Sequence, residues 1–137
     1  MRVLVTGGRD YANDFFVSMT LASIGKLFND DVTLIVGDAT GVDAMARKSG
    51  EALGWSVEVF NADWDEHGRA AGPIRNKRMI EEGKPDVVVA YPGGRGTADC
   101  VSQAGEAGVL VQCVRDYQSF RGVMEELRKH FKGQVSA

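Results

Sequence analysis

The residues of this chain best suited to chemistry lie in two glycine-rich loops, TGGRDY at residues 6–11 and YPGGRGT at residues 91–97. Each loop follows an apolar run and precedes a pattern typical of a helix. Glycines let backbone N–H groups approach a ligand closely, and the start of a helix offers unsatisfied N–H donors and partial positive charge to a phosphate. We therefore predict that the second loop binds phosphate, with packing alone as the alternative role of its glycines. The predicted contacts are Gly93, Gly94, Gly96 and Thr97.

Further candidates lie in the first loop and in the segment GDATGVD at residues 37–43. Arg9 could bind a phosphate through two parallel hydrogen bonds, which lysine would do less well, or could be an ordinary surface arginine in a turn. A carboxylate near the end of the second strand is where Rossmann-type proteins bind ribose hydroxyls, so Asp38 and Asp43 are candidates. Asp43 could instead serve only to favour the first turn of a helix. The glycines included in this predicted site are Gly7, Gly8 and Gly41.

Residues 67–78 carry four basic side chains and no acidic one, in a protein with a net charge of −3. The Gly-Pro pair in this stretch suits the first turn of a helix, whose N–H groups together with Arg69 and Arg75 would form a second anion-binding corner. Asn76 could hydrogen-bond a sugar or a base edge. Trp64 could stack on a base, although an aromatic residue after a strand more often belongs to the core. A solvated basic face is the alternative interpretation of the arginines.

Apolar runs typical of strands alternate along the chain with helical patterns. Strands are expected at residues 3–5, 32–36, 55–60, 86–91 and 109–114, and helices at about 13–28, 42–53, 73–82, 98–107 and 120–131. The alternation predicts right-handed βαβ units, and hence an α/β fold: a Rossmann-like, doubly wound parallel sheet of about five strands flanked by helices. We expect a single domain over residues 1–137, with a tail that frays from residue 132. A strand order of 3-2-1-4-5 would bring both glycine-rich loops to one crevice, at the carboxyl ends of the first and fourth strands.

Composition argues against several functional classes. The chain has 16 basic and 19 acidic residues, which makes non-specific nucleic-acid binding improbable. It contains no apolar run of 18 residues and opens on a strand-like segment, so we expect a cytoplasmic protein with no membrane span and no secretory signal. Neither loop matches the P-loop or the complete GxGxxG fingerprint. Cys100, Cys113 and the two histidines lack the spacing of a zinc site, and we predict no metal and no cofactor.

Four segments together resemble the SLOG superfamily, specifically its YspA/YpsA-related branch: TGGRDY, VGDATGVDAMA, ADWDEHGRAAGPIRN and YPGGRGTAD. The superfamily includes the Lonely-Guy phosphoribohydrolases, often labelled lysine decarboxylases. The resemblance extends to about residue 114 and implies a Rossmann-like fold, nucleotide-derived ligands and frequent homodimers. It also implies that the PGGRGT loop binds phosphate and that Arg75 and Asn76 face the ligand.

The chain departs from the family pattern at two positions. Asp38 stands where the second residue of a glycine pair is usual, and Cys100 stands where the hydrolases carry a glutamate, three positions after the threonine of PGGxGT. Cleavage of an N-glycosidic bond builds positive charge on the ribose, which a carboxylate near the anomeric carbon stabilises. If the chain is an enzyme, Asp99 and Arg75 are the catalytic candidates, and Asp38 or Asp43 could replace the missing glutamate.

Our leading hypothesis is a non-enzymatic module that senses or sequesters a nucleotide-derived small molecule, such as a nucleoside monophosphate, ADP-ribose or a cyclic relative. The first alternative is an N-ribosyl hydrolase, a phosphoribohydrolase acting on nucleoside 5′-monophosphates. The second alternative is a nucleic-acid-binding accessory protein, against which the acidic balance counts. A homodimer is expected in each case from the family resemblance.

Overall fold

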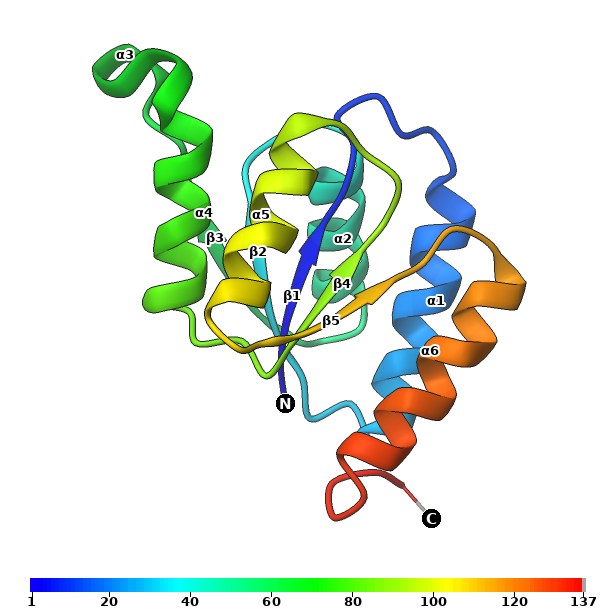
Figure 1. Ribbon diagram of the computed structural model, residues 1–137. Coiled ribbons are helices and arrows are strands. Elements are labelled where there is room, and N and C mark those ends of the chain that lie inside the picture. Colours follow the sequence, from blue (N-terminus) through cyan, green and yellow to red (C-terminus); the bar gives the residue numbers. More distant parts are fainter. Residues whose placement is uncertain (137) are drawn as a thin grey trace.

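The computed structural model describes residues 1–136 and contains one five-stranded, all-parallel sheet (Figure 1). The strands are β1 (Arg2–Thr6), β2 (Thr33–Gly37), β3 (Ser56–Phe60), β4 (Val87–Ala90) and β5 (Leu110–Cys113). Their order in the sheet is β3-β2-β1-β4-β5. The predicted Rossmann-like α/β fold is confirmed, and the strand order is the one that would bring both glycine-rich loops to one crevice.

Five helices of at least eleven residues flank the sheet. They are α1 (Asp14–Leu27), α2 (Val42–Ala52), α4 (Ala71–Glu81), α5 (Arg95–Glu106) and α6 (Tyr117–His130). The helices α1, α2 and α6 cover one face of the sheet, while α4 and α5 cover the other (Figure 1). Every helix within residues 1–136 is too short or too polar to serve as a membrane span.

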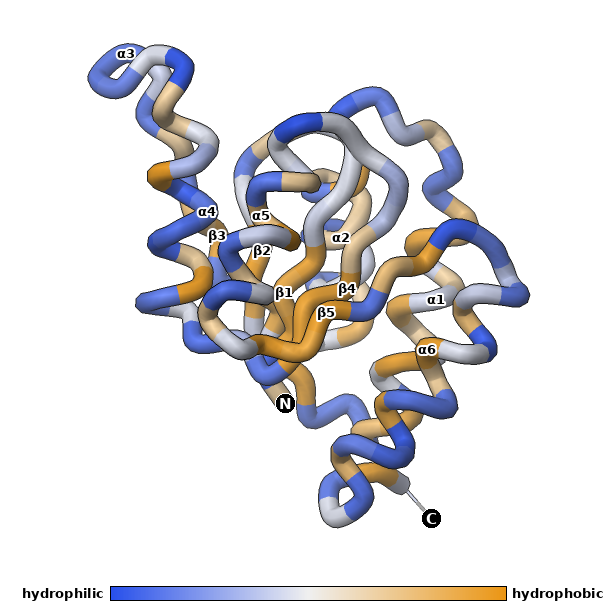
Figure 2. Tube along the Cα trace, in the orientation of Figure 1, coloured by the Kyte–Doolittle hydropathy of each residue, from blue (hydrophilic) through white to orange (hydrophobic). Residues whose placement is uncertain are grey.

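The central strands are apolar on both faces because each face is covered by helices. Val3 and Val5 of β1 point into the larger core, which contains the apolar stripes of α1, α2 and α6. Leu4, between them, points into the smaller core with Cys100 of α5 and Met79 of α4. Figure 2 accordingly shows hydrophobic residues concentrated along the strands and hydrophilic residues on the outer surfaces of the helices.

The segment before α4 differs from the prediction. A short helix, α3 (Trp64–His67), and a 3₁₀ turn, Gly68–Ala70, occupy a stretch in which no element was expected. The turn continues directly into α4, because the N–H group of Ala71 donates to the carbonyl of Gly68. The helix therefore begins at Ala71 rather than Pro73, and the N–H group of Ala71 is already bonded to the preceding turn.

The last described residues lie against α1, where fraying was expected. The N–H group of Ser136 donates to the Leu27 carbonyl at 2.7 Å, and the Ser136 hydroxyl donates to the Lys26 carbonyl at 3.1 Å. Val135 packs on the larger core. These contacts satisfy two carbonyls at the C-terminus of α1, which have no partner within the helix.

Candidate ligand-binding cleft

A cleft of about 810 Å³ opens at the carboxyl ends of β1 and β4, between the loops that follow these strands and the helices α4 and α5. This is the point at which the strand order reverses, where ligands bind in doubly wound folds. Its volume lies within the usual range for small-molecule sites, roughly 300–1,000 Å³. Most of the predicted site residues line it: Gly7, Gly8, Arg9, Asp43, Arg69, Arg75, Asn76, Gly93, Gly94, Gly96, Thr97 and Asp99.

The N-terminus of α5 opens into this cleft. The helix begins at Arg95, and Gly94 at the cap position has no side chain with which to satisfy the first N–H groups. The first intrahelical bond runs from the Ala98 N–H group to the Gly94 carbonyl, at 3.0 Å. The N–H groups before Ala98 thus have no side-chain cap in the described chain, and they carry the positive end of the helix dipole.

The three loops at this edge of the sheet are bonded to one another. The N–H group of Gly8 donates to the Pro92 carbonyl at 2.8 Å, and the Gly8 carbonyl accepts from the Val42 N–H group at 3.1 Å. A Cβ on Gly7 would lie only 2.5 Å from Val42 Cγ2, so packing alone requires glycine there. Gly41 has φ +71°, and a Cβ there would overlap the carbonyl groups of Gly8 and Arg9; Gly41 does not line the cleft.

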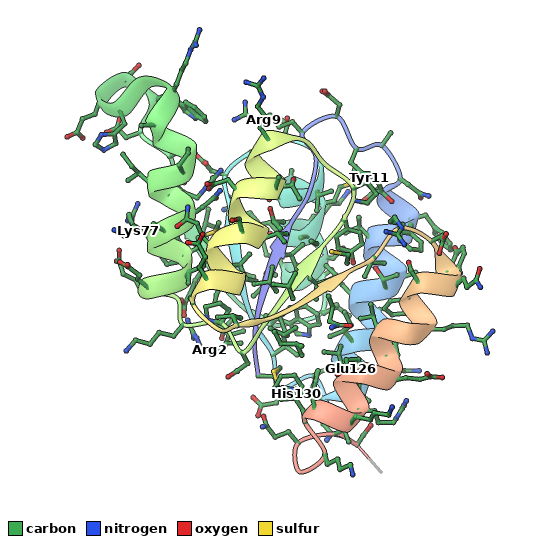
Figure 3. The ribbon with its side chains drawn as sticks, in the orientation of Figure 1. Arg2, Arg9, Tyr11, Lys77, Glu126 and His130 are labelled. Atoms are coloured by element: carbon green, nitrogen blue, oxygen red, sulfur yellow. The ribbon has the colours of Figure 1, made fainter. Side chains whose placement is uncertain are left out.

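Three exposed arginines, Arg9, Arg69 and Arg95, line the cleft. Within residues 1–136 none of them forms an ion pair with a carboxylate. Figure 3 shows Arg9 close to the N-terminal end of α5. An anion entering the cleft would therefore meet three guanidinium groups that form no ion pair within the described residues.

The remaining basic residues of the 67–78 stretch behave differently. Lys77 and Arg78 form ion pairs with Glu81 and Glu82 one turn later on α4, at 3.9 and 3.3 Å. Figure 3 shows Lys77 on the outer side of this helix. These two residues therefore lie on an exposed face of the helix and do not line the cleft, which for Arg78 agrees with the alternative of a solvated basic face.

A network of hydrogen bonds between side chains of α4 and α5 forms the floor of the cleft. Arg75, which is 8% exposed, donates from Nη1 to Asp38 Oδ1 at 2.9 Å and from Nε to Asn76 Oδ1 at 3.0 Å. The Asn76 amide donates in turn to Asp99 Oδ2 at 2.9 Å and to the Gly96 carbonyl at 3.2 Å. Asn76 thereby connects the guanidinium group to both the helix N-terminus and a cleft carboxylate.

Asp99 is positioned by two amides and remains available to a ligand. Its Oδ2 accepts from Asn76 and from Gln103 Nε2, each at 2.9 Å. No group in the described chain donates to Oδ1. The carboxylate can therefore accept a hydrogen bond from a hydroxyl or amino group in the cleft.

Asp38 does not line the cleft, contrary to the interpretation that it binds ribose. Its Oδ1 pairs with Arg75 and also accepts the Ala62 N–H group at 3.2 Å. These bonds hold Asp38 beside Arg75, where its side chain lines a separate, smaller hollow next to α2. Its observed contact is with the Arg75 guanidinium, whose charge it partly compensates.

Asp43 lines the cleft but is only 6% exposed. Burial raises the pKa of its carboxyl from 3.8 to about 6, against the opposing effects of the Arg75 charge and the bond from the Ala39 N–H group. The Asp43 carboxyl and the Arg75 guanidinium both lie against the backbone of Gly37, because a Cβ on this glycine would overlap each of them. The carboxyl therefore takes up a proton in mildly acidic solution.

Cys100, which stands where the family resemblance led us to expect the glutamate of a hydrolase, is fully buried in the smaller core. Burial raises the pKa of its thiol to about 11. The thiol is therefore protonated at neutral pH and is no substitute for a carboxylate. The acidic side chain of this turn that reaches the cleft is that of the preceding residue, Asp99.

Trp64 is 45% exposed and lines the cleft, so the interpretation that it belongs to the core is wrong. The list of predicted site residues left out several others that line the cleft: Thr6, Asp10, Tyr11, Ala39, Gly72, Pro73, Met79, Pro92 and Arg95. Most of them lie in segments that the sequence analysis had already singled out, namely the TGGRDY loop, the Gly-Pro pair of α4 and the PGGRGT loop, and could have been included on that ground. Met79 carried no such signal, because a residue of an amphipathic helix can face either the core or a cleft.

The structure offers no evident metal site at this edge of the sheet. Across the described residues, no three histidine, cysteine or acidic side chains gather closely enough to hold a metal ion. The polar groups of the cleft are instead amides, arginines and single carboxylates, which suit an organic anion bearing hydroxyl groups.

Comparisons with known proteins agree with the motifs. The model of a family described as "YspA, cpYpsA-related SLOG family" matches residues 1–67. Gene 61 protein of Mycobacterium phage D29 is 36% identical over 119 residues, which cover 80% of this chain and 93% of the phage protein. A solved structure from Methanocaldococcus jannaschii, described as a predicted subunit of tRNA methyltransferase, aligns with 92% of this chain and 76% of that chain, with a TM-score of 0.42 and 16% identity.

The structural likeness is too low to support any argument, whereas the sequence relationship extends over most of both proteins. The residues matched by the family model include the TGGRD loop after β1 and the GDATGVD segment after β2. Each segment contributes residues to the cleft, Gly7, Gly8 and Arg9 from the first and Ala39 and Asp43 from the second. The chain belongs to the YspA, cpYpsA-related SLOG family.

Proposed function

We propose that this chain binds a phosphate-bearing nucleotide derivative in the cleft and acts as a sensor or sequestering module. One observation carries the proposal: the uncapped N-terminus of α5 opens into the same cleft as Arg9, Arg69 and Arg95, which have no acidic partner within the described residues. Backbone N–H groups and guanidinium groups are the donors that bind phosphate best in proteins. Membership of the SLOG family supports a nucleotide-derived ligand.

The floor of the cleft supports a ligand with hydroxyl groups next to its phosphate. Asp99 Oδ1 is available as an acceptor, and the Asn76 and Gln103 amides hold the carboxylate in place. A ribose would supply donors of the required kind. Nucleoside 5′-monophosphates and ADP-ribose combine both features and are the candidates we favour.

The experiment is thermal unfolding of the full chain with AMP, ADP-ribose, cyclic ADP-ribose and NAD. A ligand at one hundred times its dissociation constant adds about 2.7 kcal/mol, which raises the Tm of a domain of this size by roughly 10 °C. Arg95→Ala should weaken binding by about tenfold, because a charge-assisted hydrogen bond is lost. Arg128→Ala, an exposed arginine on the distant helix α6, is the matched control. A folded protein that shows no shift with any compound would contradict the proposal, as would equal losses in the two variants.

A second candidate function is N-ribosyl hydrolysis of a nucleoside 5′-monophosphate, favoured by the positioned carboxylate of Asp99. This carboxylate could stabilise the positive charge that develops on the ribose as the bond to the base breaks and water adds to the anomeric carbon. Chromatography of the mixture after incubation of the chain with AMP, to detect free base and ribose 5-phosphate, distinguishes hydrolysis from binding alone. A hydrolase would release both products and lose turnover, but not binding, in Asp99→Asn. Binding of AMP without release of either product would exclude hydrolysis and agree with a sensor or sequestering module.

A further inference from the structure

Trp64 is a large, partly exposed apolar side chain at the mouth of the cleft, and the phosphate and ribose contacts proposed above do not involve it. It is the first residue of α3, its side chain is 45% exposed, and it lines both the cleft and a shallower hollow beside α3. Tryptophan is seldom left this exposed, because its ring has more apolar area to bury than any other side chain. A ligand that covered the ring would gain that burial.

The surroundings of Trp64 hold its ring in one place. Asp63 caps α3 by accepting the Glu66 N–H group at 3.0 Å, which fixes the turn that carries the tryptophan. On the side of α4, the ring lies beside Gly72, where an added Cβ would stand 3.5 Å from the end of the indole. The edge of the indole therefore lies against the backbone of α4, which supports the ring on that side.

The guanidinium group of Arg9 lies over this ring, with its central carbon 5.1 Å from the ring centroid. Arg9 comes from the loop after β1 and Trp64 from the far side of the cleft, so the two side chains meet across its mouth. A guanidinium group and a nucleobase are both flat and delocalised, and both stack on aromatic faces. A base can thus take the place on the indole that Arg9 occupies here.

We propose that Trp64 is the stacking platform for the base of the bound nucleotide, and that Arg9 covers it until the ligand arrives. This inference rests on the proposed function and narrows the ligand to a nucleotide with an intact aromatic base, as opposed to a sugar phosphate. The ligand extends from the N-terminus of α5, which binds the phosphate, to α3, which binds the base. Displaced from the ring, Arg9 is free to pair with the phosphate.

The test compares ligands that differ only in possessing a base. Isothermal titration calorimetry would measure the binding of AMP, ADP-ribose and ribose 5-phosphate to the full chain, to Trp64→Ala and to Trp64→Phe. Removal of the platform should weaken AMP and ADP-ribose binding by about tenfold or more, while ribose 5-phosphate changes by less than about twofold. Trp64→Phe keeps an aromatic face and should retain most of the affinity for AMP. Circular dichroism of each variant verifies its fold.

A second readout uses fluorescence. Trp55→Phe leaves Trp64 as the sole tryptophan, since the chain has two. Stacking of AMP should quench the emission of this variant, while ribose 5-phosphate should not.

The outcomes separate this inference from the proposed function. If the unaltered chain binds AMP and ribose 5-phosphate equally well, or if Trp64→Ala weakens both alike or neither, the stacking inference is wrong while the proposed function stands. If the unaltered chain binds none of the three compounds, both are wrong.

Discussion

Asp43 lies at the floor of the cleft, where the fold opposes its ionisation. Its carboxyl is buried, and its pKa is raised to about 6 although the Arg75 charge and the Ala39 N–H group both favour the carboxylate. In the unfolded chain the same group ionises near pH 3.8. The charged form is therefore retained at neutral pH at a cost in stability, which is common for ionisable groups at binding sites.

We predict that stability falls as the pH rises from about 4 to 6, because in this range the folded chain binds a proton that the unfolded chain releases. Each pKa unit is equivalent to about 1.4 kcal/mol, so ionised Asp43 should lower the free energy of unfolding at pH 7 by about 3 kcal/mol. Asp43→Asn, which keeps an acceptor for Ala39, should remove this dependence and raise the Tm at pH 7. Urea unfolding at a series of pH values measures the effect, with the exposed Asp65→Asn as control. Parallel curves for Asp43→Asn and the unaltered chain would contradict the prediction.

The helix α5 both packs on the sheet and presents its N-terminus to the ligand. Cys100 and Ala104 hold it on the smaller core, while Gly96 in its first turn lines the cleft. A Cβ on Gly96 would contact nothing within 4 Å, so the glycine is not required by the packing of the chain. Any need for glycine at this position must therefore come from what enters the cleft.

We predict that Gly96→Ala has opposite effects on stability and binding. Replacement of a helical glycine by alanine should raise the free energy of unfolding by up to about 1 kcal/mol. The added methyl group should obstruct the approach of a phosphate to the helix N-terminus and weaken AMP binding by about tenfold. Urea unfolding and calorimetric titration measure the two effects.

Gly105→Ala, in the same helix and equally free of contacts, is the matched control. It should stabilise the chain without a change in AMP affinity. Unaltered AMP binding by Gly96→Ala would place the phosphate elsewhere.

At the scale of the whole molecule, the cleft and the C-terminal segment lie at opposite ends of the sheet (Figure 1). The segment bonds to α1 through Ser136 and packs Val135 on the larger core. These contacts connect the last residues to a helix early in the chain, far from the groups that line the cleft. Stability and ligand binding should therefore respond separately to changes at the C-terminus.

We predict that removal of residues 133–137 lowers the free energy of unfolding by about 2–3 kcal/mol, from three lost hydrogen bonds, two made by Ser136 and one by the Gln134 N–H group, and part of one apolar side chain. Affinity for AMP should not change. Ser136→Ala removes only the hydroxyl bond and should have a smaller effect. Thermal unfolding with and without AMP measures both quantities, and a loss of AMP affinity on truncation would show that the two ends of the molecule are coupled. Homodimerisation stays a prediction from the family, to be measured by analytical ultracentrifugation.

The fold was predictable from the sequence because its signals are local. The run VVVA of β4 is continuously apolar, as a strand covered on both faces requires, and the stripe of Phe120, Met124 and Leu127 in α6 has the period of a helix. The start of α4 was not predictable in this way. Pro73 indicated a helix start, but the hydrogen bonding of the preceding 3₁₀ turn extended the helix back to Ala71.

The sequence by itself determined the class of the fold and the edge of the sheet at which the loops after the strands lie. These follow from the alternation of strands and helices and from the rule that parallel strands end at one edge. Only the tertiary structure decided which side chains reach the cleft. Asp38 pairs with Arg75 outside the cleft, whereas Asn76 and Gln103 orient Asp99 into it. The guanidinium group of Arg9 lies over the ring of Trp64 at the mouth of the cleft. Such pairings join residues distant in the chain, so no local pattern specifies them; they depend on burial and on competition among hydrogen-bond partners once the helices have packed.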